Sequence, residues 1–438
     1  MPWPTRQSEC FAMPSSVSGG IGSEWRARLS ASGADALYLH IPFCARKCAY
    51  CDFVSWATAR GDALSRRYAE ALERQVEEVS CLGLLTECET AYIGGGTPTF
   101  LGEALGGLVR CVTRCAPRVC ELTCEANPDS LSDAVLSDVA AAGCTRLSIG
   151  VQSLCDAELS ELGRLHDAAR ARERVSVAVA SGLDVSCDLM CAVPLQTADS
   201  WQATLEGVAS LGVGHVSVYP LQIEDGTALA RRIGDEQPSW NSPDTQASRM
   251  EQAQSVLESY GFRRYEVASY ASLPEKECTH NKMYWTGRPY LGLGTGAASM
   301  LTVEGYKRLL EACPQLGPIP EGMTRARLKV VSGREEIARG ASLSSLALEE
   351  EFLTERQAVA EDLMLGARLA CGLDAGLVAY ARELLGPCVD ETLDRLVREG
   401  FLSDALAPTQ RGWLLGNELY GELWDLAGDT ETLSRRSA

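Results

Sequence analysis

Tyr38-Leu39-His40-Ile41-Pro42-Phe43-Cys44-Ala45-Arg46-Lys47-Cys48-Ala49-Tyr50-Cys51 joins an apolar, strand-like run to a loop that carries three cysteines. The thiols of Cys44, Cys48 and Cys51 have the spacing C-x3-C-x2-C. Iron–sulfur clusters are normally held by four thiolates, so three leave one iron open to a small chelating ligand. Arg46 and Lys47 add positive charge, which favours thiolates and offsets the negative charge of a cluster. The segment therefore predicts a [4Fe–4S] site at the C-terminal end of a strand.

Two other interpretations of the three thiols are open at this point. A structural zinc ion could take His40 as a fourth ligand beside the cysteines. His40 falls within the expected strand, four residues before Cys44, so its side chain should lie along the sheet rather than in the loop. Inert, buried thiols are the second alternative. We consider both weaker than the cluster.

Outward from this segment, short β-branched or apolar runs alternate with longer helical segments, which is typical of βα units around a parallel sheet. Strands are expected at residues 36–41, 90–93, 121–125, 146–151, 185–193 and 215–221. Helices are expected at residues 64–82, 131–142, 168–180 and 201–211, each near a glycine that can end it: Gly83, Gly143, Gly182 and Gly212. The fold class is thus α/β. A partial (β/α)6 barrel is favoured over a doubly wound sheet, because polar residues follow the strand ends where barrel enzymes build their sites.

The alternation fades after residue 221. A polar stretch precedes an expected helix at residues 245–260 and a strand at 264–269, and Gly, Pro and Arg gather between residues 287 and 322. Beyond a boundary near Gly340, helices are expected at residues 350–370, 375–385, 388–398 and 411–426. We therefore divide the chain into an extension expected to be disordered (1–33), a barrel domain (34–340) and a small helical, winged-helix-like domain (341–438).

Composition restricts the class of partner. The 438 residues include 59 acidic and 40 basic side chains, for a formal net charge of -19, which gives no basic surface to neutralise phosphates. Nucleic acid is therefore not expected as a partner. An apolar cargo or a small metabolite suits the composition better. No uncharged apolar run reaches the ~20 residues that cross a bilayer, so a membrane-spanning segment is not expected.

The chain contains 18 cysteines, too small a fraction for a secreted disulfide scaffold. The first residues lack the continuous apolar stretch of a signal peptide, so we expect a reducing cytoplasm.

A second cysteine group, Cys111, Cys115, Cys120 and Cys124, resembles a metal site only superficially. Cys111 and Cys115 lie one turn apart on an apolar helix face, and Cys124 falls in the next strand, so buried packing is the better interpretation.

Several further motifs give the chain a family resemblance. They are residues 38–53, Gly94-Gly95-Gly96-Thr97-Pro98-Thr99, Glu125-Ala126-Asn127-Pro128, Gly150-Val151-Gln152-Ser153 and Leu162-Gly163-Arg164-Leu165-His166. Together with the cysteine spacing they resemble the radical S-adenosylmethionine superfamily, in the branch that contains the oxygen-independent coproporphyrinogen III oxidases and the HemW haem chaperones. The resemblance spans nearly all of the chain after residue 35. It implies a [4Fe–4S] cluster on the three cysteines and S-adenosylmethionine as the ligand of the open iron.

The resemblance also implies which residues contact S-adenosylmethionine. The matching positions are Tyr38, Gly94, Gly95, Thr97, Glu125, Gln152, Arg164 and Asp188. Glycines let the backbone approach a ligand closely. Arg164 suits the ligand's carboxylate, because a guanidinium can meet a carboxylate with two hydrogen bonds. Glu125 and Asp188 can accept hydrogen bonds from an ammonium group or from ribose hydroxyls.

Two segments favour a haem carrier over an oxidase within this branch. The oxidases generally carry a fourth cysteine two residues after the third, where this chain has Phe53. His280-Asn281-Lys282-Met283-Tyr284-Trp285 reproduces the H-N-x-x-Y-W element associated with haem binding. His280 is the expected haem ligand, Tyr284 and Trp285 offer flat apolar surface, and Cys278 is a second candidate.

Two segments depart from the branch. Relatives usually have an aromatic residue and a glycine before the proline where this chain has Cys191-Ala192-Val193-Pro194, and they commonly have histidine where it has Ala298. The departure at Ala298 puts a haem or proton-transfer role there in doubt.

Taken as a whole, the resemblance predicts a haem chaperone with a cluster, S-adenosylmethionine and haem as cofactors, and a haem-accepting apoprotein, for example a respiratory one, as partner. A coproporphyrinogen III oxidase of porphyrin biosynthesis is the alternative.

Overall fold

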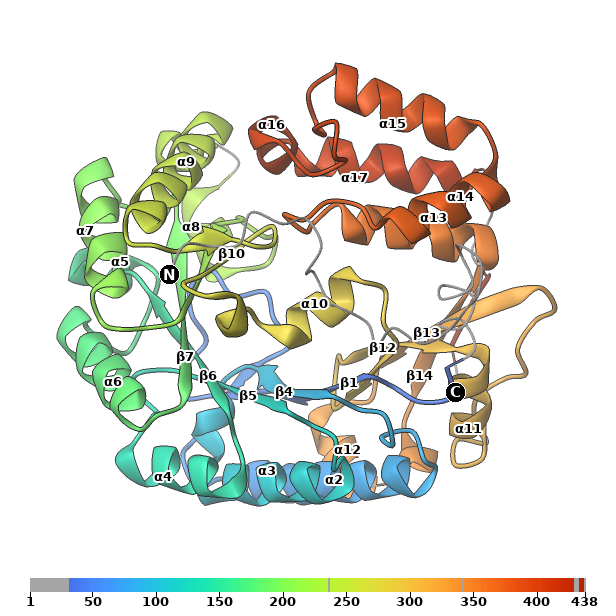
Figure 1. Ribbon diagram of the computed structural model, residues 1–438. Coiled ribbons are helices and arrows are strands. Elements are labelled where there is room, and N and C mark those ends of the chain that lie inside the picture. The colour runs from blue at the N-terminus through green and yellow to red at the C-terminus, as the bar shows by residue number, and fades with distance from the viewer. Residues whose placement is uncertain (1–30, 235–236, 341, 429–432, 437–438) are drawn as a thin grey trace.

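A mixed thirteen-stranded sheet organises the protein in the computed structural model, which describes residues 31–234, 237–340, 342–428 and 433–436 (Figure 1). The predicted extension 1–33 therefore lies almost entirely outside the described residues. The strand order is β15-β14-β13-β12-β11-β1-β4-β5-β6-β7-β8-β10-β9. A separate pair, β2 (Phe43–Cys44) and β3 (Trp56–Ala57), flanks the cysteine loop.

Six strands pair in parallel in the order of the sequence. They are β1 (Ala36–Ile41), β4 (Thr90–Gly95), β5 (Glu121–Ala126), β6 (Arg146–Gln152), β7 (Asp184–Cys191) and β8 (His215–Pro220). Each begins within one residue of the predicted start, so the predicted parallel α/β sheet is confirmed. The chain passes from strand to strand in one direction.

Helices connect these strands along one side of the sheet and form an arc around it (Figure 1). They are α2 (Ala63–Cys81), α3 (Glu103–Cys115), α4 (Asp133–Ala142), α5 (Asp156–Glu161), α6 (Ala168–Ala180) and α7 (Ala198–Ala209). Local chemistry sets their ends. Ser132 accepts a hydrogen bond from the Val135 backbone at the start of α4, and Gly143 ends the same helix with a φ of 111°.

The segment after β8 contains α8 (Ala228–Ile233), α9 (Pro243–Ser259), β9 (Arg263–Arg264), β10 (Ser269–Ala271) and α10 (Thr279–Trp285). The predicted continuous strand at 264–269 is wrong. The backbone of Tyr265 donates to the carbonyl of Ser269, which closes a turn between the two short strands. Strands β9 and β10 consequently pair with each other in antiparallel fashion, and β10 covers the edge of β8.

The other edge of the sheet is extended beside β1. Strand β11 (Tyr290–Leu293) is parallel to β1, and the strands beyond it are antiparallel: β12 (Ala298–Thr302), β13 (Met323–Val330), β14 (Leu348–Thr354) and β15 (Leu433–Arg436). Helices α11 (Val303–Leu310) and α12 (Arg334–Gly340) lie among them. Five single-turn 3-10 helices complete the elements of the described residues: Pro98–Leu101, Ser239–Asn241, Pro274–Lys276, Leu343–Ser345 and Asp425–Ala427.

The predicted helix at residues 350–370 is wrong in its first part. Residues 348–354 form β14, which pairs with β13, and α13 (Glu355–Gly366) begins only at the capping box of Thr354 and Gln357. The sheet thus continues past residue 340, and Phe352 belongs to its hydrophobic core. A second core begins with Val359.

The C-terminal helices surround this second core. They are α14 (Ala375–Leu385), α15 (Cys388–Arg398), α16 (Gln410–Leu414) and α17 (Gly416–Trp424). The first two have the predicted bounds, but the predicted single helix at 411–426 is interrupted at Leu415, whose backbone leaves the helical region. Within the described part of the chain, no helix is long and apolar enough to cross a membrane.

Candidate functional site

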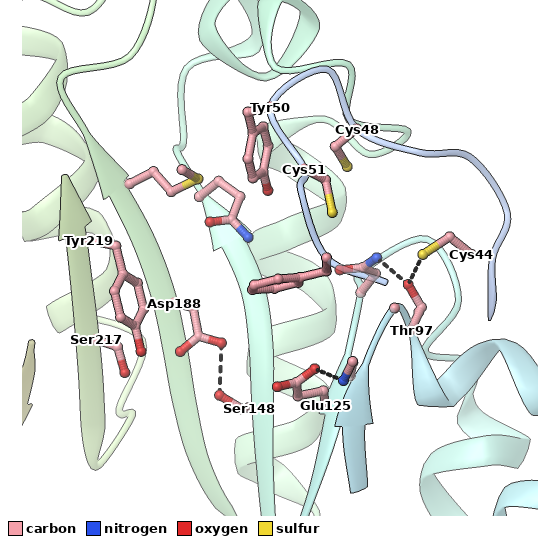
Figure 2. Close-up of a pocket in the computed structure, with 18 of the residues that line it drawn as sticks. Cys44, Cys48, Tyr50, Cys51, Thr97, Glu125, Ser148, Asp188, Ser217 and Tyr219 are labelled. Carbon is pink, nitrogen blue, oxygen red and sulfur yellow. Dashed lines mark hydrogen bonds between the residues drawn. The ribbon is translucent and has the colours of Figure 1, made fainter. Parts of the chain in front are cut away.

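A cavity of about 460 Å³ opens at the C-terminal ends of the parallel strands, beneath the cysteine loop (Figure 2). Its walls come from alternate strand residues, because side chains of a strand alternate between the two faces of a sheet. Lining pairs of this kind are Thr123 and Glu125, Ser148 and Gly150, Asp188 and Met190, and Ser217 and Tyr219. All three predicted cluster cysteines line the same cavity.

Each of the three thiols receives one polar contact from a different part of the chain. The Thr97 hydroxyl donates to Cys44 Sγ at 3.5 Å, Arg164 Nη1 lies 3.4 Å from Cys48 Sγ, and Ser55 Oγ lies 3.8 Å from Cys51 Sγ. Hydrogen bonds to ligating sulfurs are a means by which proteins tune iron–sulfur clusters. Figure 2 shows Cys48 and Cys51 on the loop and Cys44 beside Thr97.

Burial acts against the thiolate form at two of these positions. It raises the pKa of the Cys44 thiol to about 11 and also raises the pKa of Cys51. A buried thiolate without a compensating charge is unfavourable, and metal binding stabilises it by releasing the proton. These thiols therefore suit a ligand that brings its own positive charge, such as iron.

The zinc alternative does not fit the geometry. His40 uses both ring nitrogens elsewhere: Nδ1 lies 3.0 Å from the Tyr38 hydroxyl, and Nε2 lies 2.8 Å from the Val54 carbonyl. Among the described residues, no three His, Cys, Asp or Glu side chains converge closely enough to hold a single metal ion. In a cubane cluster each thiolate binds a different iron, so its three sulfurs lie further apart than three ligands of a single metal ion.

The glycine segment closes one wall beside Cys44. A Cβ atom on Gly96 would lie 2.9 Å from Cys44 Sγ, and one on Gly95 would lie 2.6 Å from the His40 ring. Gly95 also has a φ of 114°, which a side chain disfavours. Gly95 and Thr97 line the cavity, whereas Gly94 lies behind them, where a Cβ would meet Tyr92 and Glu125.

Two half-buried carboxyl groups face the cavity. Glu125 accepts hydrogen bonds from the Tyr92 hydroxyl and the Gly95 amide, both at 2.9 Å, and Asp188 accepts one from the Ser148 hydroxyl at 2.8 Å. Burial raises the pKa of Glu125 to about 7 and that of Asp188 to about 6. Both can thus change protonation near neutral pH, and a cationic ligand would favour the ionised forms.

Arg164 lies against the cluster loop rather than free in the cavity. Its Nη2 donates to Asn127 Oδ1 and to the Gly150 carbonyl, both at 2.7 Å, while its buried Nε has no partner among the described residues. The position is consistent with contact to a ligand on the open iron. Gln152 lines the same wall with a φ of 67°, at an irregularity in the pairing of β6 and β7.

Tyr38 does not belong to the cavity lining among the described residues. Its ring stacks on Tyr92 with centroids 6.2 Å apart, and its hydroxyl contacts His40. The structure therefore places Tyr38 behind the wall of the cavity. The Tyr38 side chain packs against residues of that wall and does not line the cavity.

The predicted haem ligand His280 is buried behind the same wall. Its Nδ1 lies 2.9 Å from the Thr90 hydroxyl and its Nε2 lies 3.1 Å from the Tyr284 hydroxyl. The ring stacks on Tyr92, and burial lowers its pKa to about 3. In this conformation His280 acts as a neutral structural histidine. No lone pair of its ring faces the cavity.

The other residues of the H-N-x-x-Y-W segment have different surroundings. Tyr284 packs edge-on against Tyr290, and Trp285 donates to Glu266 at 3.0 Å and lies beneath Arg368 of the C-terminal helices. Asn281 lines the cavity, and so does Cys278. Asn281 is therefore the only residue of the segment that the structure, over its described part, brings to the cavity.

Sequence reasoning missed several residues of the site. Asn127 contacts both Arg164 and Thr97, and Ser55 contacts Cys51. Ser148 and Ser217 border Asp188. Strand periodicity could have identified the two serines, because each lies two residues before another cavity residue on its own strand.

The remaining predictions for this region have clear outcomes. Phe53 is 62% exposed at the rim of the cavity. Ala192 has a φ of 55°, which explains why a glycine is expected there, and Ala298 lies exposed on β12. In the second cysteine group, Cys111 and Cys124 are buried in the hydrophobic core, as predicted, whereas Cys115 is half-buried and Cys120 is exposed.

The residues present thus fit a [4Fe–4S] cluster with S-adenosylmethionine. Three thiols with one polar contact each surround one end of the cavity, and the wall at Gly96 leaves no room for a side chain. Beside them lie two titratable carboxyl groups and the unpartnered Nε of Arg164, which suit an amino acid and a ribose.

Comparisons with known proteins agree with this fit. Residues 38–208 match the model of the Radical SAM superfamily. The heme chaperone HemW of Mycobacterium tuberculosis is 34% identical over 390 residues, which cover 87% of this chain and 92% of that protein. The heme chaperone HemW of Bacillus subtilis is 30% identical over 394 residues, which cover 88% and 97%.

A solved structure shares the fold over almost the whole length. It is coproporphyrinogen III oxidase (HemN) from Escherichia coli, a radical SAM enzyme, with a TM-score of 0.70 and 20% identity over 93% of both chains. At that identity the likeness concerns the fold alone. It extends to the parallel sheet and to the C-terminal helices.

Proposed function

Because the chain belongs to the family of HemW haem chaperones, within the radical S-adenosylmethionine superfamily, we propose that it binds haem and delivers it to an acceptor protein. The observation that carries this proposal is the extent of the similarity, which covers 92% and 97% of two chaperones. Phe53 supports the choice, because the related oxidases generally carry a cysteine there.

We propose that Cys44, Cys48 and Cys51 hold a [4Fe–4S] cluster and that the cavity beneath them holds S-adenosylmethionine. The cluster would supply one-electron chemistry when bound. Arg164 and Thr97 keep two of the ligating sulfurs in place, and the Gly95 amide orients Glu125 toward the cavity. Glu125 and Asp188 would accept hydrogen bonds from the amino group and the ribose of the ligand.

The haem contact at His280 stays a prediction. Ligation of haem iron by this residue requires its hydrogen bonds to Thr90 and Tyr284 to break and α10 to shift. Asn281 and Cys278 need no such movement to meet a molecule in the cavity. A comparison of variants at these positions therefore distinguishes ligation from structural support.

The finer architecture is likewise a proposal. We infer that the arc of six parallel strands is the partial barrel of this superfamily, a view supported by the order of the strands and the single helical layer. The C-terminal helices, with an isolated bridge between Leu402 and Pro408, are compatible with a winged-helix-like unit. The two hydrophobic cores support a division between Phe352 and Val359 rather than at residue 340.

The identity of the acceptor, expected to be a haem-binding apoprotein such as a respiratory one, stays a prediction, and so does a cytoplasmic location. A direct experiment tests the chaperone against the oxidase. The anaerobically reconstituted protein should bind haem stoichiometrically and transfer it to an apoprotein. It should leave coproporphyrinogen III unchanged when S-adenosylmethionine and a reductant are present. Decarboxylation without haem binding would replace the chaperone by the oxidase.

A further inference from the structure

Two tyrosines beside the cavity each have a base as the hydrogen-bond partner of the hydroxyl. Tyr92 lines the cavity and donates to Glu125 Oε1 at 2.9 Å, and the Tyr38 hydroxyl lies 3.0 Å from His40 Nδ1. His40 Nε2 lies 2.8 Å from the Val54 carbonyl, which only accepts, so the ring proton is on Nε2 and Nδ1 accepts from Tyr38. Burial lowers the pKa of His40, which keeps the ring neutral. Both hydroxyl protons thus lie within the reach that proton transfer to a base requires.

The rings of the two tyrosines are neighbours as well. Tyr38 stacks on Tyr92 with centroids 6.2 Å apart and an angle of 28° between the planes. Tyr92 also stacks on His280 at 5.2 Å, and the hydroxyl of Tyr284 lies 3.1 Å from His280 Nε2. Aromatic pairs at these distances are in direct contact. An electron can therefore pass from the ring of Tyr38 to that of Tyr92 while each proton goes to its own acceptor.

Packing alone does not require this arrangement. A buried tyrosine needs a hydrogen-bond partner, but a backbone carbonyl is enough, as for Tyr68, which donates to the His40 carbonyl at 3.1 Å. Tyr306 donates to the Glu350 carboxylate at 2.6 Å, yet it does not line the cavity. In the pair beside the cavity, a base for each hydroxyl and stacked rings occur together.

We propose that Tyr92 and Tyr38 form a relay that quenches a carbon-centred radical in the cavity. The proposal rests on the proposed function, because such a radical arises when the cluster passes one electron to the sulfonium of S-adenosylmethionine and a carbon–sulfur bond breaks. A carrier that converts no substrate leaves this radical without a productive target, and the radical would then attack the thiolates of the site. Tyr92 offers it an O–H bond that is weaker than the C–H bonds of aliphatic side chains.

The reaction balances in atoms and electrons. The O–H bond of Tyr92 breaks, a C–H bond forms on the cavity radical, and the unpaired electron moves to the Tyr92 oxygen. Tyr38 then gives one electron to Tyr92 and its proton to His40 Nδ1, while Tyr92 regains a proton from the Glu125 carboxyl group. A one-electron reductant in solution restores Tyr38 with the proton held by His40, and Glu125 takes up a proton from the cavity. The net reaction consumes one electron and one proton from solution.

The test follows hydrogen into the deoxyadenosine that is released from S-adenosylmethionine. The reconstituted protein is transferred to deuterium oxide and given S-adenosylmethionine and dithionite under anaerobic conditions, and the product is analysed by mass spectrometry. Hydroxyl hydrogens exchange with the solvent, whereas carbon-bound hydrogens do not. Tyr306→Phe is the matched control, because it removes a buried hydroxyl with a carboxylate partner away from the cavity, and Tyr219→Phe removes another tyrosine of the lining.

The parent should release deoxyadenosine with a single deuterium. Tyr92→Phe should lower this deuterium content roughly tenfold or more, since loss of a positioned reacting group costs at least this factor. Tyr306→Phe and Tyr219→Phe should match the parent. Tyr38→Phe should keep the deuterium, because Tyr92 still donates, but freeze-quench EPR should then find the tyrosyl radical on Tyr92 alone. Iron content and affinity for S-adenosylmethionine are measured for every variant, so that a failure to assemble the site is recognised.

A second measurement uses the full chain without cluster or S-adenosylmethionine. One-electron oxidation by a photogenerated ruthenium(III) complex should give a long-lived tyrosyl radical in the parent. Tyr38→Phe should lower the yield of this radical roughly tenfold or more, because a positioned base contributes factors of this order or more to proton transfer. Tyr306→Phe should leave the yield unchanged.

Equal deuterium content in Tyr92→Phe and the parent would overturn the relay, and so would equal yields of the long-lived radical in Tyr38→Phe and Tyr306→Phe. A parent that binds its cluster and haem but releases no deuterated deoxyadenosine refutes the relay alone and leaves the proposed function intact. A parent that assembles no cluster refutes the relay together with the cofactor assignment.

Discussion

Arg164 Nη1 lies 3.4 Å from the Sγ atom of Cys48, although 116 residues separate the two in the sequence. The guanidinium reaches the thiol from the turn after α5, and Nη2 is fixed by Gly150 and Asn127. The arginine expected to bind the carboxylate of S-adenosylmethionine thus also touches a cluster ligand. If Cys48 binds the proposed cluster, we expect ligand binding and the electronic properties of that cluster to be linked through this one side chain.

Replacing Arg164 by alanine should affect both properties. The cluster should still assemble, but its midpoint potential should fall, because a positive charge and a hydrogen bond at the Cys48 sulfur are lost. Affinity for S-adenosylmethionine should fall roughly ten- to a hundredfold, the equivalent of ~1.5–3 kcal/mol for a charge-assisted hydrogen bond. Redox titration followed by EPR and ligand titration measure the two effects. An unchanged potential would contradict the contact.

Affinity for S-adenosylmethionine should rise as pH increases from about 5 to 7. Burial raises the pKa of Glu125 to about 7 and that of Asp188 to about 6, so both are largely protonated at the lower pH. A cationic ligand favours their ionised forms, and binding should therefore release protons in this range. Calorimetry in buffers of different ionisation enthalpy measures the release. Glu125→Gln should remove its upper part, and pH-independent affinity would argue against both carboxyl groups.

Variants at His280 and Asn281 separate support from ligand contact. His280→Ala should lower stability by roughly 1–3 kcal/mol, because the hydroxyls of Thr90 and Tyr284 lose a buried partner. Asn281→Ala should leave stability nearly unchanged but weaken binding of the molecule in the cavity. Urea unfolding and haem titration report the two effects. A histidine ligand to haem would instead show a changed haem spectrum in His280→Ala at unchanged stability.

Ala192→Gly should stabilise the protein. Ala192 has a φ of 55°, a conformation that costs an alanine roughly 1 kcal/mol and a glycine almost nothing. The greater freedom of glycine in the unfolded chain offsets part of the gain. Urea unfolding should show a small increase in stability, whereas Ala140→Gly within α4 should show a decrease of about 1 kcal/mol. Destabilisation by Ala192→Gly would contradict the strain.

The six parallel strands and the helices α2, α4, α6 and α7 could be predicted because their patterns agree with their surroundings. Parallel strands buried on both faces are nearly continuous apolar runs, and glycines end the helices between them. The predicted helix is wrong over residues 350–354, because their glutamates and leucines favour a helix, whereas pairing with β13 makes them part of a strand. No local pattern reports that pairing.

The site was predictable in its motifs but not in its contacts. The cysteine spacing identified all three thiols of the cavity, since it lies in one short segment. The hydrogen bond from Thr97 to Cys44 and the position of Arg164 beside Cys48 join distant segments, which only the fold brings together. The burial of His280 has the same cause, because its partner Thr90 lies 190 residues away.

The most direct test measures iron, sulfide and the EPR spectrum of anaerobically reconstituted protein with and without S-adenosylmethionine. The parent should contain about four irons per chain, and S-adenosylmethionine should change the spectrum of the reduced cluster by binding the open iron. Cys44→Ser, Cys48→Ser and Cys51→Ser should each lose the cluster, while Cys111→Ser should retain it. A full cluster in Cys48→Ser, or a spectrum that S-adenosylmethionine leaves unchanged in the parent, would contradict the account.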